Sequence, residues 1–184
     1  MLAKPPTPAR TPSVLWTDLL LVAFLIGFDA VARLLPHAPG FMPVAASALF
    51  AGRMLRIPGL APIVPVAAMA LSGVAMGPDD WRITLIIYAA IALPAFAGMA
   101  SRRWRGAPVI FAVMLPCSLF FFALSNFAVW AFSGMYALDW QGLTGCYVAA
   151  LPFLQNTVAG DMFWTAVLFG GAWAVQSLPA LARR

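Results

Sequence analysis

Three side chains that form strong hydrogen bonds, Asn126, Asn156 and Asp161, lie within apolar sequence in the second half of the chain. An Asn or Asp at membrane depth is expensive unless it finds a partner, so such residues usually face a bundle interior or a wet cavity. We therefore expect the segment 125–164 to form one wall of a binding cavity. The alternative is that these side chains only join helices, through hydrogen bonds worth about 0.6 kcal/mol each.

Aromatic residues and a proline-rich loop accompany these polar side chains. Trp130 and Tyr147 lie close to them in sequence, where a belt at the membrane surface and stacking on a ligand are both open interpretations. The segment 36–43 contains three prolines, which fix φ and stiffen the backbone, and it also holds His37 and Phe41. The predicted ligand-binding residues are His37, Phe41, Asn126, Trp130, Tyr147, Asn156 and Asp161.

Catalytic and metal-binding patterns are weak in this chain. It has one His, His37, and all six of its acidic residues are Asp. The sequence contains no HExxH, GxSxG or P-loop motif. Cys117 and Cys146 lack the spacing of a CxxC or Cys/His site, so we interpret them as buried thiols, with a metal site of Cys146 and His37 as the weaker alternative. We predict that the protein is not an enzyme and carries no metal or cofactor.

The composition is that of a membrane protein. Of the 184 residues, 63% are hydrophobic and 9% are charged, whereas roughly a quarter of a soluble domain is charged. A transmembrane helix needs about 20 residues. The chain therefore has room for about six spans and for no soluble domain, which predicts an all-α, polytopic membrane fold.

The apolar runs divide the chain into a leader, 1–13, and a single transmembrane domain, 14–184. We expect the leader to be disordered. The predicted spans are 14–35, 44–52, 61–76, 83–99, 108–132 and 156–178. The second is too short to cross a membrane alone unless the loop 36–43 dips into the bilayer, so we expect this loop to act as a lid. A further apolar run, 146–154, is predicted to be a short interfacial or re-entrant helix that ends near Pro152.

Basic residues cluster in alternate loops, which predicts the orientation of the chain. The residues expected on the cytoplasmic side are Lys4, Arg10, Arg53, Arg56, Arg102, Arg103, Arg105, Arg183 and Arg184. Only Arg33 and Arg82 are expected on the other side. Because cytoplasmic loops are enriched in Lys and Arg, both termini are predicted to be cytoplasmic. The net charge of +5 therefore reflects membrane topology, and no nucleic-acid partner is expected.

The first span, 14–35, has two further features. It also fits a secretory signal peptide, with Ala30 and Ala32 as a small-x-small cleavage site. We favour a retained span, because the apolar run is long enough to cross the membrane. Asp29 and Arg33 are four residues apart and share one helical face, so we expect them to pair with each other.

Three segments, 35–46, 125–130 and 146–161, resemble an uncharacterised bacterial membrane family known as domain of unknown function 6580. That family is grouped with the substrate-binding S components of energy-coupling-factor (ECF) vitamin transporters, and the similarity extends from about Asp29 to Gly170. The resemblance implies a six-helix S-component fold with a ligand near the outer face, beneath the loops 36–43, 77–82 and 133–145. The family's characteristic Asp after a Ser near the end of the third span corresponds here to Gly73.

The resemblance also implies a function. It predicts a multi-pass protein of the bacterial inner membrane that takes up a vitamin or related micronutrient, with an ECF coupling protein and ATPases as possible partners beside the lipid bilayer. Small residues on the second span would form the surface for the coupling protein: Ser47, Ala48, Ala51 and Gly52. A corrinoid is a candidate ligand because Cys146 is expected on the outer side. The alternative function is a small structural or assembly subunit of a larger membrane complex.

Overall fold

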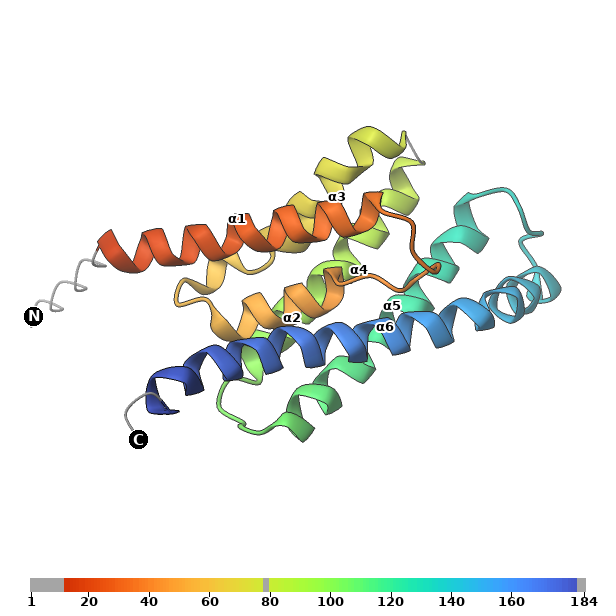
Figure 1. The fold of residues 1–184 in the computed structure, drawn as a ribbon. Helices are drawn as coiled ribbons and strands as arrows, with labels where there is room; N and C mark the ends of the chain where they lie inside the picture. The colour runs from red at the N-terminus through yellow and green to blue at the C-terminus, as the bar shows by residue number, and fades with distance from the viewer. Residues whose placement is uncertain (1–11, 78–79, 182–184) are drawn as a thin grey trace, which may run out of the picture.

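The computed structural model describes residues 12–77 and 80–181, and every regular element within these residues is a helix (Figure 1). The helices are α1 (Pro12–Leu34), α2 (Val44–Met54), the 3-10 turn η1 (Pro58–Leu60), α3 (Ile63–Met76), α4 (Trp81–Ala100), α5 (Ala107–Phe132) and α6 (Trp140–Leu181). Five apolar segments are long enough to cross a membrane, and α2 is the shorter exception. The predicted all-α membrane fold is confirmed.

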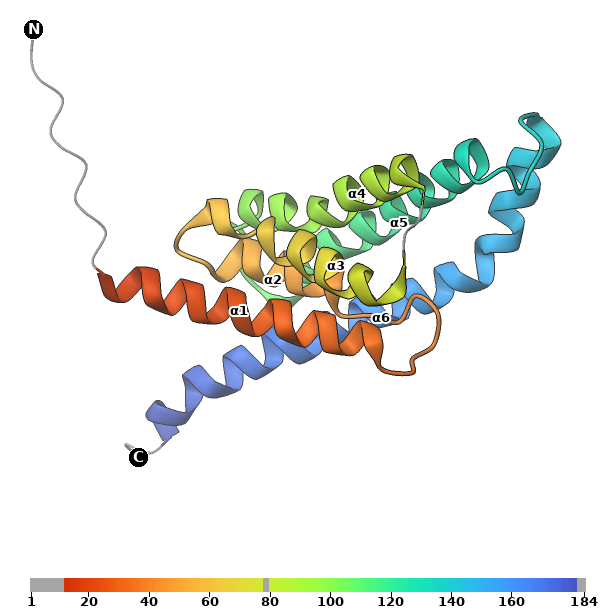
Figure 2. The ribbon, with the colours of Figure 1, turned by 90° about the horizontal axis from the view of Figure 1, so that it is seen from above.

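Helix α2 lies at the centre of the bundle and does not cross a membrane by itself. Its 11 residues extend about 16 Å, roughly half of a 30 Å hydrocarbon core. Every residue from Val44 to Gly52 is buried, and α2 packs against α1, α3, α4, α5 and α6. The connection from α1 turns back into the bundle to reach it (Figures 1 and 2). The loop therefore enters the bundle, as the shortness of this span predicts.

Small residues bring α2 and α4 into backbone contact. A Cβ atom on Gly52 would collide with the backbone of Ala95, and one on Gly98 would lie 3.1 Å from the Cα of Gly52. Ser47, Ala48 and Ala51 are also fully buried. The expectation that the small residues of α2 form an exposed surface for a coupling protein is therefore wrong, because they mediate packing inside this chain.

Two arginines fasten the ends of α2 and α4 to each other. Arg53 donates to the backbone carbonyl of Ser101 at 2.7 Å and to that of Trp104 at 2.7 Å. Arg102 donates in return to the carbonyls of Gly52, at 2.7 Å, and Leu55, at 2.8 Å. The last carbonyls of a helix lack partners within the helix. These exchanged contacts satisfy them and fix the relative position of the two helices.

Helix α6 is longer than predicted. Its 42 residues correspond to about 63 Å, about twice the thickness of a bilayer core. The predicted separate helix at 146–154 is wrong, because this segment and Pro152 lie within α6. Proline lacks an N–H group and its ring crowds the preceding turn, so it kinks a helix. Helix α6 is bent in Figure 2, and residues 133–139 form the connection to it from α5.

The connections alternate between two ends of the bundle. The loops 55–62 and 101–106 lie at the end where α1 starts and α6 finishes, which we call the basic end (Figure 1). The loops 35–43 and 133–139 lie at the opposite end, as do the adjoining ends of α3 and α4. The predicted leader, 1–13, falls mostly outside the described residues, and α1 begins at Pro12. Leu25 of α1 is fully buried in the core of the bundle.

Candidate functional site

A cavity of about 260 Å³ lies beneath the loop that joins α1 to α2, and we call it the central cavity. Its wall combines a cation, an acid and apolar side chains from nearly every helix of the bundle. The lining residues are Arg33, Gly40, Met42, Val44, Ala45, Met69, Ile87, Ile91, Phe121, Thr157 and Asp161. Ionisable residues that line a cavity inside an apolar helix bundle mark a candidate functional site.

Asp161 of α6 is held by a partner on the neighbouring helix. Its Oδ2 accepts a hydrogen bond of 2.6 Å from the hydroxyl of Ser118 in α5. Asp161 is only 4% exposed, and it lines the central cavity. The Ser118 contact offsets part of the cost of burying this carboxyl group. It also fixes the direction in which the carboxyl group points.

Arg33 lies near the end of α1 and is anchored by α3. Its Nε donates to the hydroxyl oxygen of Ser72 at 2.7 Å, and its Nη1 donates to the sulfur of Met42 at 3.7 Å. Ser72 in turn donates to the carbonyl of Ala68 at 2.8 Å. The guanidinium group is thereby placed at the boundary between α1, α3 and the loop.

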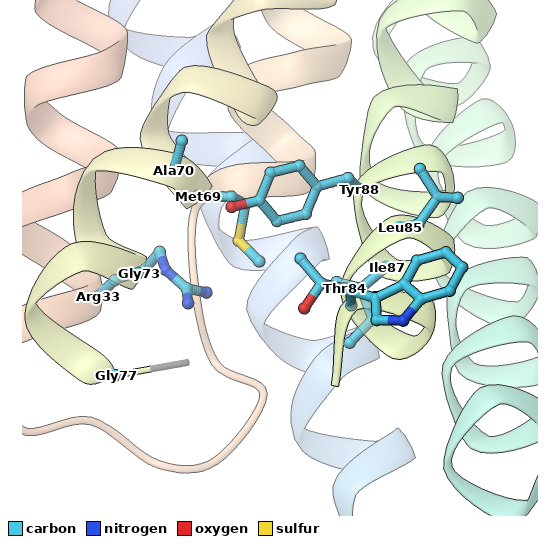
Figure 3. A pocket seen from close by; sticks show the side chains of 10 residues that line it. Arg33, Met69, Ala70, Gly73, Gly77, Thr84, Leu85, Ile87 and Tyr88 are labelled. Atoms are coloured by element: carbon cyan, nitrogen blue, oxygen red, sulfur yellow. The ribbon is translucent and has the colours of Figure 1, made fainter. Parts of the chain in front are cut away.

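Arg33 also lines a second and more open space between α3 and α4. This α3–α4 cleft has a volume of about 570 Å³, and Arg33, Met69 and Ile87 belong to both it and the central cavity. Figure 3 shows the guanidinium group of Arg33 on one side of the cleft, with Thr84 and Tyr88 of α4 on the other. The two spaces therefore lie side by side, with Arg33, Met69 and Ile87 between them.

The N-terminus of α2 contributes a second positive element to the central cavity. Pro43 precedes α2 without a side-chain cap, and the first residues of the helix, Val44 and Ala45, line the cavity. The first N–H groups of a helix lack partners within it and carry the positive end of its dipole. Half-length helices that end at membrane depth present this charge to anionic groups of substrates in several transporters.

The loop above the cavity is packed against α6. Gly40 has φ of +82°, a backbone region that glycine adopts readily, and a Cβ atom there would collide with Thr157. A Cβ atom on Gly160 would lie 2.8 Å from the Cα of Phe41. The Phe41 ring contacts Phe163, with their ring centroids 5.5 Å apart. Among the predicted ligand-binding residues, Phe41 thus holds the loop in place and does not line the cavity.

Asp29 forms a contact that the sequence did not indicate. It is fully buried, and its Oδ1 accepts a 2.7 Å hydrogen bond from Ser47 of α2, while its Oδ2 has no hydrogen-bond partner. Arg33 acts on Asp29 electrostatically. The hydrogen bonds described for the guanidinium group lead instead to Ser72 and Met42. Asp29 therefore fastens α1 to α2 beside the site.

Three of the other predicted ligand-binding residues lie where α5 meets the first half of α6. Asn126 donates to the carbonyl of Phe122 in its own helix at 2.7 Å. Trp130 donates to the carbonyl of Ala137 at 2.9 Å, and Tyr147 donates to that of Ala123 at 2.6 Å. The Tyr147 contact joins α6 to α5, and none of the three residues lines the central cavity.

The last two predicted residues also lie outside the central cavity. His37 is exposed, and its Nδ1 lies 2.6 Å from the carbonyl oxygen of Leu35. Asn156 is half-buried on α6 and is not part of the cavity wall. Asp161 is thus the single predicted residue that the structure brings to the cavity.

Other residues of the site were missed by sequence reasoning. Ser72 and Ser118 are polar residues inside apolar helices, the same signal that identified Asp161, but Ser is too common in membrane helices to stand out. Nothing in the sequence marks Met42 or Met69 as residues of a binding site. Within residues 12–77 and 80–181, no group of three or more His, Cys, Asp or Glu side chains is arranged to hold a metal ion.

Comparisons with known proteins give a family but no function. No curated protein and no solved structure matches this chain. One family model, described as a family of unknown function (DUF6580), matches residues 14–181, which include every residue of the central cavity. The chain therefore belongs to the family of unknown function DUF6580.

Proposed function

We propose that this protein is a transport protein of the bacterial inner membrane that binds a small micronutrient, in the manner of an ECF S component. The observation that carries the proposal is the central cavity, in which Arg33 and Asp161 line one space inside an apolar bundle. Charged groups at such depth usually mark the path of a substrate or ion. A purely structural bundle would gain more from apolar residues at these positions.

The arrangement of the loop 35–43 suggests how a ligand would enter. This loop covers the central cavity and contacts α6 through Gly40 and Phe41. Because these contacts join a short loop to a single helix, they can break without unpacking α2 from the other helices. In the proposed cycle the loop opens, the ligand enters from the end opposite the basic end, and the loop closes over it.

The size of the central cavity favours a small metabolite over a corrinoid. Its 260 Å³ lies below the roughly 300–1,000 Å³ of pockets for drug-sized ligands. Cys146, the thiol that would have to meet the cobalt, is buried and donates to the carbonyl of Asn126. We therefore propose a ligand much smaller than a macrocycle.

Mass spectrometry of small molecules released from the purified protein tests the proposal. We expect one metabolite to be retained by the unaltered protein and lost from Asp161→Leu, which should still fold because a costly polar group has been removed from the membrane interior. Ser125→Ala is the matched control, since Ser125 bonds only within its own helix, to Phe122. Proteoliposomes should then accumulate the same metabolite. Lower thermal stability of Asp161→Leu with retention unchanged would contradict the cavity as the binding site.

A structural subunit of a larger complex is the second candidate, and the length of α6 favours it. The part of α6 near Trp140 extends beyond the other helices, and it exposes large apolar side chains such as Val148. Such an arm can pack against another membrane protein. Isolation in mild detergent distinguishes the two functions, because a subunit should co-purify at fixed stoichiometry with its complex, and a transporter should carry a metabolite. Co-purification of a coupling protein and ATPases would support energised uptake.

A further inference from the structure

We propose that the ligand of the central cavity is a small zwitterion of the amino-acid type, whose carboxylate faces Arg33 and whose ammonium group faces Asp161. This inference rests on the proposed function and names its substrate class. It follows from the guanidinium side chain of Arg33 and the carboxyl side chain of Asp161, which line one cavity of about 260 Å³.

The carboxylate end is defined by Arg33 and by the start of α2. A guanidinium group binds a carboxylate through two parallel hydrogen bonds, which makes it the preferred side chain for this group. One of the contacts of Arg33 is to the sulfur of Met42, a weak acceptor that a carboxylate oxygen outcompetes. The N-terminus of α2, at Val44 and Ala45, adds positive charge to the same wall.

The ammonium end is defined by Asp161. Its Oδ2 is occupied by Ser118, which directs the carboxyl group, and the side chain is 96% removed from solvent and lines the cavity. An ammonium group has three donors and forms short, charge-assisted hydrogen bonds with a carboxylate. A ligand with only an anionic group would bring a second negative charge toward Asp161. A ligand with only a cationic group would be repelled by Arg33.

A ligand of the amino-acid type also has a side chain, and the remaining residues of the cavity wall set the size and polarity of that side chain. Met42, Met69, Ile91 and Phe121 present only apolar surface and weakly polar sulfur. A zwitterion has no net charge, so its binding leaves the total charge of the apolar site unchanged, and each of its charges meets an opposite charge. An apolar side chain of moderate size therefore completes the expected ligand.

The test measures the thermal shift of the purified protein with each of the twenty standard amino acids. For the amino acid that gives the largest shift, affinity is then compared with that of its decarboxylated and its deaminated forms, which share the same side chain. If leucine is best, these are 3-methylbutylamine and 4-methylpentanoate. We expect each form to bind at least about tenfold more weakly, equivalent to about 1.4 kcal/mol. No shift with any amino acid, or equal affinity for either truncated form, would overturn the zwitterion.

Substitutions of Arg33 and Asp161 test which residue binds the carboxylate of the ligand and which binds its ammonium group. Arg33→Lys keeps the positive charge and should weaken binding of the amino acid about tenfold while leaving affinity for the amine form nearly unchanged. Asp161→Asn should do the reverse, reducing the preference for the amino acid over its deaminated form. Arg82→Gln and Asp139→Asn are the matched controls, because both residues are exposed and lie outside the central cavity. Equal preferences in the variants and the unaltered protein would contradict the assignment.

The same measurements separate failure of the ligand class from failure of the proposed function. A retained and accumulated metabolite that is not a zwitterion would overturn the ligand class and leave transport intact. The absence of any retained molecule, together with the absence of uptake in proteoliposomes, would contradict both the ligand class and the proposed transport function.

Discussion

At the scale of single residues, two buried acids have the same kind of partner and different surroundings. Asp161 bonds to Ser118 and lines the central cavity, whereas Asp29 bonds to Ser47 between α1 and α2. An acid beside a cavity can exchange its partners with a ligand. An acid between packed helices can only hold them together, so we assign binding to Asp161 and helix packing to Asp29.

Ser47→Ala tests the role of Asp29 without changing any charge. The substitution leaves both oxygens of a fully buried carboxyl group without a hydrogen bond, which costs about 1–3 kcal/mol. Asp29→Asn should cost less, because the amide oxygen can still accept from Ser47. Melting temperature measured with and without ligand checks both variants, and Ser125→Ala is the control. Neither variant should change ligand affinity, so an affinity loss at unchanged melting temperature would place Asp29 in the binding site.

The sequence identified Asp161 as a residue of the site but did not identify Arg33 as one. Asp161 stands out because an ionisable residue in an apolar run is rare. Arg33 stands out equally, and its spacing from Asp29 suggested a local pair; the two do interact electrostatically, but Arg33 also donates to Ser72, 39 residues away, which the sequence did not indicate. Asn126 was predicted because it is a polar side chain within apolar sequence, and Trp130 and Tyr147 because they are aromatic residues in the same part of the chain. In the structure Asn126 bonds within α5, Trp130 bonds to the connection after α5, and Tyr147 bonds from α6 to α5, so none of them reaches the central cavity.

At the scale of elements, the site depends on a half-length helix and the loop that leads to it. The loop 35–43 can return to mid-depth because Gly160 of α6 leaves room for the backbone of Phe41. Sequence predicted the short α2 and the inward loop from their lengths alone. It could not predict the uninterrupted α6, because a proline within a helix and a proline at its end leave similar patterns.

Gly160→Ala tests whether this close approach holds the loop. In an exposed helix position, Gly→Ala stabilises by about 1 kcal/mol, but here the new Cβ would lie 2.8 Å from the Cα of Phe41. Gly170→Ala is the matched control on the same helix, since no atom lies within 4 Å of its Cβ position. We expect a lower melting temperature and faster ligand release for Gly160→Ala, and an unchanged or higher melting temperature for Gly170→Ala. Equal shifts for the two variants would show that the loop does not depend on this contact.

At the scale of the whole molecule, the charges of the described residues divide between two ends. Arg53, Arg56, Arg102, Arg103 and Arg105 lie at the basic end. Arg33 and Arg82 lie toward the opposite end, where the α3–α4 cleft and the loop above the central cavity are also found. The orientation of the chain in the membrane therefore decides which compartment supplies the ligand.

Labelling of single introduced cysteines tests this orientation, because the native Cys117 and Cys146 are both buried and should give little background. Arg56→Cys and Arg105→Cys place a thiol at the basic end, and Asp80→Cys and Asp139→Cys place one at the opposite end; all four positions are exposed. Since loops rich in Lys and Arg remain in the cytoplasm, a membrane-impermeant maleimide should label Asp80→Cys and Asp139→Cys in intact cells. Arg56→Cys and Arg105→Cys should be labelled only after permeabilisation, and the unaltered protein is the control. The reverse pattern would place the central cavity on the cytoplasmic side, and uptake from outside by this route would then be excluded.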